Sequence, residues 1–233
     1  MNEDHFRQYL EKAANAALVG EKNRPQKKWQ IVAVSKLQLA DKIQRLHSWG
    51  HIAFGENYVQ ELINKIEFIN NPSIQWHFIG HLQKNKVKYL VKQVDLIHSV
   101  DSLALAETID KKSKEKNHKQ KILLQVNLAG ENSKSGFDKN QLLTEWPVLQ
   151  KLANVQIQGL MTMPPLFEEP QQNRPFFVEL RTLLADLKST LQNDQHSMTE
   201  LSMGTSQDAL IALEEGSTMI RVGTALFGER PQH

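Results

Sequence analysis

Short apolar or β-branched runs alternate with longer segments of helical periodicity along almost the whole chain. Eight of these runs are predicted as strands, at residues 31–35, 52–54, 76–79, 96–100, 122–127, 155–160, 199–202 and 218–222. Between them, apolar residues return every three or four positions at 39–49, 58–69, 103–114, 142–152, 176–191 and 207–213. This alternation is typical of parallel strands joined by crossover helices.

The number of strand–helix units and the length of the chain together predict the fold class. About eight units in 233 residues indicate an α/β fold, a single (β/α)8 TIM barrel slightly below the usual size. A doubly wound open sheet is the alternative. We expect one domain over residues 1–233, in which residues 1–28 form a leading N-terminal helix. Its amphipathic part, residues 5–19, is expected to cover the bottom of the barrel or to pack outside it.

The charge balance and the missing cysteine restrict the classes of partner. With 28 Lys and Arg against 26 Asp and Glu, the formal net charge of +2 gives no electrostatic attraction for nucleic acid or an anionic membrane. The chain has no cysteine, which excludes disulfides and thiolate chemistry. No apolar stretch approaches the length that spans a bilayer. We therefore expect a cytoplasmic protein with a small-molecule partner.

Lys36 directly follows the first predicted strand, where barrel strands end at the functional face. An amine held against apolar neighbours loses part of its preference for the charged form and can then attack an aldehyde. The alternative interpretation is a lysine that points into solvent, as most lysines after strands do. The residues at the other strand ends decide between the two.

Two strand ends near the C-terminus, at 202–206 and 221–224, combine glycine with hydroxyl side chains. Backbone N–H groups and a helix N-terminus at such turns make an anion site, and many barrels build a phosphate site after strands seven and eight. Glycine at a turn is otherwise a means of reaching positive φ. Arg221, on the last strand, is expected to need a ligand atom or a carboxylate as its partner.

Residues after the second and third strands carry weaker signals. Glu56 and Asn57 follow a glycine, and helix capping is an alternative to ligand contact for both. We retain Asn57 as a candidate contact. His77 and His81 flank a strand end and do not share a helix face, so their spacing predicts no metal site.

Several longer motifs carry a more specific signal. They lie at residues 32–36 (VAVSK), 54–61 (FGENYVQE), 76–83 (WHFIGHLQ), 131–136 (ENSKSG), 159–163 (GLMTM), 201–204 (LSMG) and 216–228 (GSTMIRVGTALFG). In this order they resemble the pyridoxal phosphate homeostasis proteins (YggS-type, PROSC). The resemblance runs from residue 31 to residue 228.

The resemblance implies a barrel of the fold type III pyridoxal phosphate (PLP) class, similar to the N-terminal domain of alanine racemase. It implies that Lys36 holds pyridoxal 5'-phosphate as an internal aldimine, and that Arg221 faces the pyridine nitrogen and keeps it unprotonated. The phosphate contacts that it implies are Gly223, Thr224, Ser206 and Gly204. One departure is Thr205, where the family usually has methionine. The role of Lys134, in the ENSKSG motif, is left open.

The resemblance favours a binding protein over an enzyme. Racemases of this class recruit a second base, usually a tyrosine, from an additional domain and a partner subunit, and the sequence shows no such domain. We therefore expect a monomeric carrier or buffer in intracellular PLP homeostasis, with apo PLP-dependent enzymes as recipients. A PLP-dependent amino-acid racemase or lyase is the alternative, and a Schiff-base aldolase acting on a sugar phosphate is a third interpretation.

Overall fold

The computed structural model describes residues 2–26, 28–131 and 135–228. Eight parallel strands close into a barrel in sequence order, and the last strand pairs with the first. They are β1 Gln30–Val34, β2 Ala53–Glu56, β3 Gln75–Phe78, β4 Leu96–Val100, β5 Gln120–Val126, β6 Val155–Thr162, β7 Glu200–Ser202 and β8 Met219–Val222. The predicted barrel is confirmed, and the doubly wound open sheet is wrong.

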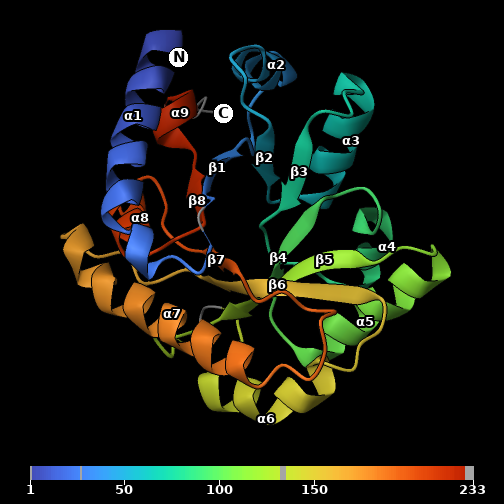
Figure 1. The fold of residues 1–233 in the computed structure, drawn as a ribbon. Helices are drawn as coiled ribbons and strands as arrows, with labels where there is room; N and C mark the ends of the chain where they lie inside the picture. Colours follow the sequence, from blue (N-terminus) through green and yellow to red (C-terminus); the bar gives the residue numbers. More distant parts are fainter. Residues whose placement is uncertain (1, 27, 132–134, 229–233) are drawn as a thin grey trace.

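The helices surround the strands, as Figure 1 shows. They are α1 Glu3–Val19, α2 Ala40–Ser48, α3 Val59–Ile69, α4 Val87–Leu90, α5 Leu103–Glu115, α6 Lys139–Leu149, α7 Arg174–Ser189, α8 Ala209–Glu214 and α9 Thr224–Phe227, with 3₁₀ turns η1 Glu21–Asn23, η2 Lys84–Lys86 and η3 Pro170–Asn173. The sequence pattern missed α4 and α9, because a single turn shows no helical periodicity. Within the described ranges, every helix is too short or too polar to span a bilayer.

Helix α6 begins at Lys139, ahead of the predicted start at residue 142. The side chain of Asp138 accepts hydrogen bonds from the backbone N–H groups of Asn140 and Gln141, at 2.9 and 3.2 Å. This cap satisfies donors that have no partner inside the helix, and it fixes the first turn. The boundary was therefore set by a capping side chain and not by the apolar pattern.

The leading helix α1 packs outside the barrel and does not close its bottom. It lies beside α8 and contacts α9 as well, so the first helix meets the last two (Figure 1). Its start is capped by Asn2, whose side chain accepts the N–H of His5 at 2.8 Å. The helix ends at Val19, and the turn η1 follows it within the expected 1–28 segment.

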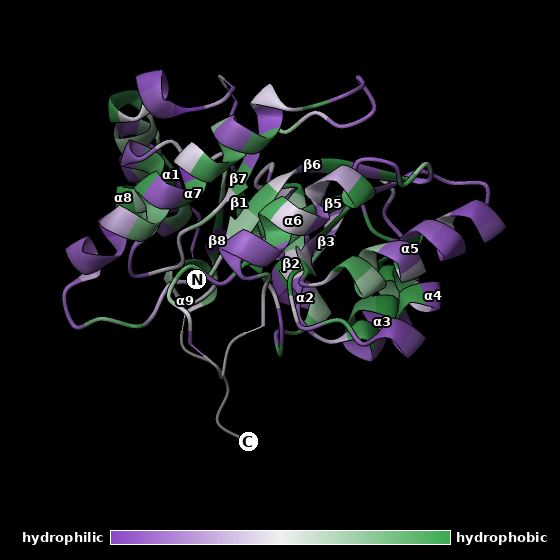
Figure 2. Cartoon of the chain, turned by 90° about the horizontal axis from the view of Figure 1, so that it is seen from below, coloured by the Kyte–Doolittle hydropathy of each residue, from purple (hydrophilic) through white to green (hydrophobic). Residues whose placement is uncertain are grey.

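The core has two layers. The larger one joins the helices to the outer faces of the strands, and in Figure 2 the helix ribbons change between hydrophilic and hydrophobic colours along each turn, as amphipathic helices do. The smaller one contains Val32, Leu96, Leu123, Met161 and Met219, which come from strands alone. Because no helix contributes to it, this second layer fills the interior of the barrel between its two ends.

Candidate functional site

A cavity of about 260 Å³ opens at the carboxyl ends of the strands. All but one of the predicted site residues line it: Lys36, Asn57, Ser206, Arg221, Gly223 and Thr224. Apolar side chains complete the wall, among them Val34, Ile79 and Met163. The barrel thus brings residues from distant parts of the chain to one face, where enzymes of this architecture have their sites. We call this space the mouth cavity.

Lys36 is held at the mouth cavity by a tight turn after β1. The backbone N–H of Gln38 donates to the Ser35 carbonyl at 3.0 Å, which closes the turn around Lys36 and Leu37. Leu37 has a φ of 60°, a left-handed conformation that costs a leucine about 1 kcal/mol. Its N–H donates to Glu61 Oε1 at 2.7 Å, which helps to offset that cost. Strain maintained in this way is typical of functional sites.

A buried ion pair stabilises this turn through a hydrogen bond to the Ser35 carbonyl. Lys65 Nζ lies 2.7 Å from Glu56 Oε1 and 2.6 Å from Glu61 Oε1, and it donates to the Ser35 carbonyl at 2.7 Å. Burial raises the pKa of Glu56, and the charge of Lys65 opposes the rise. Glu56 is the last residue of β2 and is fully buried. The helix-capping interpretation of Glu56 is therefore wrong, because its Oε1 accepts from Lys65 and Ser35, while its Oε2 is buried without a partner among the described residues.

Asn57 carries an unsatisfied polar atom at the mouth cavity. Its Oδ1 is buried and has no hydrogen-bond partner in the described part of the chain. Leaving such a carbonyl without a donor costs about 1–3 kcal/mol. The backbone of Asn57 is fixed by Gly80, where a Cβ would lie 2.1 Å from the Asn57 carbonyl oxygen. This rigid, unpaired acceptor is what a ligand with a hydroxyl or N–H donor would satisfy.

Arg221 lies on β8 and is 4% exposed, with its guanidinium at the mouth cavity. Its side chain donates to Ser202 Oγ at 2.6 Å and to the Thr162 carbonyl at 2.9 Å. The expectation of a ligand atom or carboxylate as its necessary partner is thus corrected, because neutral oxygens bind two of its nitrogens. Burial lowers the pKa of Arg221 to about 10, and Asp208 opposes this. The group therefore stays charged at neutral pH.

The loops after β7 and β8 meet at a hydrogen bond. The Gly223 N–H donates to Ser206 Oγ at 3.2 Å. Thr205, the departure from the family pattern, is accommodated because its N–H and hydroxyl donate to Asp208 Oδ1 at 2.6 and 3.1 Å. Helix α8 begins only at Ala209, and α9 is a single turn. The expected helix N-terminus is therefore present only after β8, where α9 begins at Thr224, and the other donors of the two loops are N–H and hydroxyl groups.

Gly204 lies behind the wall and does not line the mouth cavity. It is buried with a φ of 91°, and a Cβ there would lie 2.5 Å from the Ala212 Cβ. Both conditions demand glycine whatever the loop binds. We therefore interpret Gly204 as shaping the loop that carries Ser206, and we no longer expect it to contact phosphate.

The two histidines around the third strand separate into different environments. His77 is buried, and His81 is exposed with Nδ1 3.5 Å from Asp101 Oδ2. His81 lines an adjoining hollow of about 190 Å³ that shares Asn57, Ile79 and Met163 with the mouth cavity. The sequence reasoning missed Asp101, although inspecting the end of the fourth strand as well would have found it. Among the residues that the structure describes, no cluster of His, Asp and Glu could hold a metal.

One motif of the sequence falls outside the described residues. The positions concerned are 132–134, which include Lys134. The neighbouring Ser135 lies at the adjoining hollow, where its hydroxyl is 3.3 Å from His81 Nδ1. The described end of this motif is thus close to the mouth cavity.

The mouth cavity contains few kinds of reactive group. Of the described side chains that line it, only Lys36 and Arg221 are ionisable. The groups at the cavity are an amine, a charged guanidinium, an unpaired amide oxygen and loop donors. Together they suit a small, anionic molecule with a carbonyl group. A cavity of about 260 Å³ with this lining has room for one small molecule.

Comparisons with known proteins agree with this architecture. A family model described as "Alanine racemase, N-terminal domain" matches residues 12–231. The pyridoxal phosphate homeostasis protein of Aquifex aeolicus is 41% identical over 202 residues, which are 86% of this chain and 87% of that protein.

Solved structures give the same result. PipY of Synechococcus elongatus, with PLP bound, is 40% identical with a TM-score of 0.81 over 93% of this chain and 100% of that one. An alanine racemase of Clostridium difficile, at 16% identity, has a TM-score of 0.72 over 98% of this chain and 57% of its own, a likeness of fold alone.

Proposed function

The chain belongs to the family of pyridoxal phosphate homeostasis proteins, and from this premise we propose that it holds pyridoxal 5'-phosphate in the mouth cavity and releases it again. Its role is that of a carrier or buffer for the cofactor. The observation that carries the proposal is the pairing of one amine, Lys36, with one buried cation, Arg221, in a cavity lined by no other described titratable group.

The groups around the mouth cavity fit the parts of this cofactor. When bound, it supplies an aldehyde that a lysine amine can hold covalently and reversibly. The Lys36 amine is the one at the cavity, and the Ser206 hydroxyl, whose oxygen accepts from the Gly223 N–H, can donate its hydrogen to the phosphate. The unpaired Asn57 Oδ1 can accept from a hydroxyl of the ring.

Arg221 would suppress amino-acid chemistry at this site. A guanidinium has donors only and stays charged at neutral pH, so it cannot serve as a base. Where it faces a ring nitrogen, it donates to that nitrogen and leaves no place for a proton. A ring that stays unprotonated withdraws fewer electrons from a bound amino acid. These properties make the bound ring a weaker electron sink, which agrees with storage of the cofactor.

An amino-acid racemase or lyase is the second candidate, and His81 is the observation that favours it. Its pairing with Asp101 and its place in the adjoining hollow make it a possible acid or base. The His81 side chain is 63% exposed, however, so water competes for its proton. This exposure is why we rank the carrier first.

The proposal extends to the setting of the protein. We place the chain in the cytoplasm as a monomer that delivers the cofactor to apo forms of PLP-dependent enzymes. Sedimentation of the purified chain tests the monomer. Recovery of activity by an apo aminotransferase, mixed with the loaded protein, tests delivery, and recovery no faster than by spontaneous release into buffer would contradict direct transfer.

An absorption experiment separates the two candidate functions. The protein is loaded with PLP, passed through a desalting column and mixed with L-alanine or D-alanine, and the other enantiomer and pyruvate are assayed. A carrier keeps its chromophore through the column and forms no product. Sustained turnover that is lost in His81→Asn would establish the enzyme instead. A protein that leaves the column colourless would remove the cofactor from the account.

A further inference from the structure

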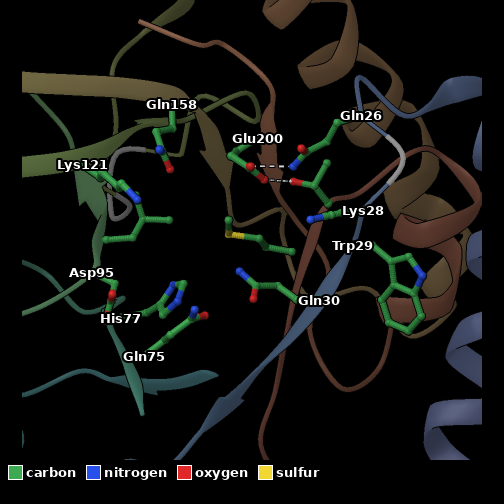
Figure 3. A pocket seen from close by; sticks show the side chains of 13 residues that line it. Gln26, Lys28, Trp29, Gln30, Gln75, His77, Asp95, Lys121, Gln158 and Glu200 are labelled. Carbon is green, nitrogen blue, oxygen red and sulfur yellow. Dashed lines mark hydrogen bonds between the residues drawn. The ribbon is translucent and has the colours of Figure 1, made fainter. Parts of the chain in front are cut away.

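A second cavity, of about 470 Å³, lies at the opposite end of the barrel, where the strands begin. Figure 3 shows it, with side chains from the first residues of several strands, such as Gln30, Gln75 and Glu200. This end of a barrel normally serves stability and carries no site. We call this space the lower cavity, and its size is that of a small-molecule site.

The lower cavity is rich in hydrogen-bond donors that the protein does not use. The amides of Gln30, Gln75 and Gln158 point toward its centre in Figure 3. Neither these amides nor the ammonium groups of Lys28 and Lys121 have a hydrogen-bond partner within the described ranges. An open donor group of this kind requires water or a ligand with acceptor atoms.

The carboxylates of the lower cavity, in contrast, already accept hydrogen bonds. Glu200 accepts from Gln26 Nε2 at 2.5 Å and from the Thr218 hydroxyl at 2.6 Å. Asp95 accepts from the backbone N–H of Trp76 at 2.8 Å. The free groups of the lower cavity are therefore two ammonium groups and three amides, whose NH2 groups are donors beside their own oxygens, and the ammonium groups favour an anionic acceptor.

A buried chain of hydrogen bonds joins the lower cavity to the mouth cavity. His77 lines the lower cavity, and its Nδ1 lies 2.8 Å from His98 Nε2. His98 Nδ1 lies 2.8 Å from Ser202 Oγ, which accepts from the Arg221 guanidinium at 2.6 Å. All of these side chains are buried, and Arg221 lines the mouth cavity. The chain therefore runs through the barrel interior from end to end.

The direction of every hydrogen bond in this chain follows from Arg221, which can only donate. Ser202 accepts from it, and because a buried hydroxyl hydrogen needs an acceptor, that hydrogen goes to His98 Nδ1, the other partner of the hydroxyl in the described structure. His98 then carries its proton on Nε2 and donates to His77 Nδ1. His77 in turn carries its proton on Nε2, on the side of the lower cavity.

The protonation of the two rings agrees with this direction. Burial lowers the pKa of His77 to about 4, and burial also lowers the pKa of His98 well below its usual value. Both imidazoles are therefore neutral near pH 7 and hold one proton each. His77 is 3% exposed, yet it offers one N–H to the lower cavity, where no described residue accepts it.

We propose that the lower cavity binds a small organic carboxylate that accepts from His77 Nε2–H, and that its occupancy is transmitted through His98 and Ser202 to Arg221. A planar pair of acceptor oxygens matches the imidazole and amide donors. The two lysines are balanced by Asp95 and Glu200, so the planar shape of the acceptor, and not its charge, is what distinguishes a carboxylate from a tetrahedral oxyanion such as phosphate. Hydrogen bonds in series polarise one another, so an acceptor at His77 alters the donors that follow.

The first experiment uses the protein without PLP and sodium succinate as the probe. The ¹⁵N and ¹H resonances of the imidazoles report the proton position in each ring. Both His77 and His98 should be neutral with the proton on Nε2, and succinate should shift the His77 Nε2 resonance saturably. Inorganic phosphate at equal ionic strength should not. A proton on Nδ1 in either ring, or a shift that phosphate reproduces, would overturn the proposal.

Matched lysine variants locate the binding. Lys121→Ala removes a cation that lines the lower cavity and should weaken succinate at least about tenfold, since a hydrogen bond to a charged group contributes about that much. Lys119→Ala makes the same charge change at an exposed residue outside the lower cavity and should bind as the unaltered protein does. Equal weakening in both variants would mean a general charge effect and would reject the site.

The transmission to Arg221 rests on the proposed function. Its test distinguishes a failure of the transmission from a failure of the proposed function. Succinate should change the rate at which PLP leaves the unaltered protein, but not the rate in Ser202→Ala, which lacks the linking hydroxyl. A saturable His77 shift without any change in that rate would reject the transmission and leave the carboxylate site standing. Failure to bind PLP would reject the proposed function, while the succinate titration would still decide the site.

Discussion

The two ends of the barrel are built from the same strands but present opposite designs. At the mouth cavity, a strained turn, a buried ion pair and two interlocked loops fix a few groups around Lys36. At the lower cavity, amide and ammonium groups surround a wider space without such restraints. Preorganisation is thus concentrated where one covalent partner is expected, whereas the other end suits a ligand that exchanges freely.

Removing the Lys36 amine should have the largest effect of the changes at either end of the barrel. In Lys36→Ala, the PLP retained through desalting should fall at least about tenfold, because the covalent link is lost and only weaker contacts remain. The urea midpoint should change little, since the residue is half-buried and outside the strands. Lys188→Ala, at an exposed position on α7, is the control and should retain the cofactor. Retention by Lys36→Ala equal to that of the control would place the site elsewhere.

Breaking the ion pair behind Lys36 should destabilise the mouth end strongly. Lys65→Met leaves Glu56 buried without its cation, which costs about 3 kcal/mol or more in the free energy of unfolding. Adding Glu56→Gln should recover part of the loss. Lys121→Met at the lower cavity should stay within about 0.5 kcal/mol, because that lysine is exposed. Equal urea midpoints for Lys65→Met and Lys121→Met would remove the contrast between the two ends.

Acid should weaken the chain of hydrogen bonds that joins the ends. Above pH 6.5 His77 is neutral in both the folded and unfolded states; below it, the unfolded state takes up a proton that the folded state refuses until about pH 4. His77 alone should therefore lower stability by about 3 kcal/mol as the pH drops through this window, and His98 and His51, whose pKa values burial also lowers, act in the same direction. Urea midpoints at several pH values check this, and a flat profile would contradict buried neutral rings.

Replacing one glycine at each end of the barrel should give the smallest effects on stability. Gly204→Ala should cost about 2 kcal/mol, because it adds a clash with Ala212 to an unfavourable positive φ. Gly50→Ala has a similar φ of 93° with nothing within 4 Å, so it should cost only about 1 kcal/mol. Thermal midpoints of both variants measure the difference. If Gly50→Ala is the more damaging, the loop after β7 is less tightly packed than we infer.

The sequence predicts the fold and the residues of the mouth cavity better than it predicts the buried side-chain contacts that hold those residues in place. Apolar runs and helical spacing are local properties, so the strands were placed within a few residues. Lys36 and Arg221 were found because strand ends gather at one face. The partnership of Glu56 with Lys65 joins β2 to α3 through packing, which no spacing in the sequence reveals. His98 lies two positions after Leu96 on β4 and so shares its interior face, but its bond to Ser202 depends on which strands meet across the barrel.

The most direct test of the account is to identify the residue that holds the cofactor. The loaded protein is reduced with borohydride, digested and mapped by mass spectrometry. The account predicts that the pyridoxyl mass is found on the peptide carrying Lys36, and that Lys36→Ala gives no labelled peptide above the level of free lysines. A reducible adduct concentrated on another lysine, with Lys36 unlabelled, would contradict it.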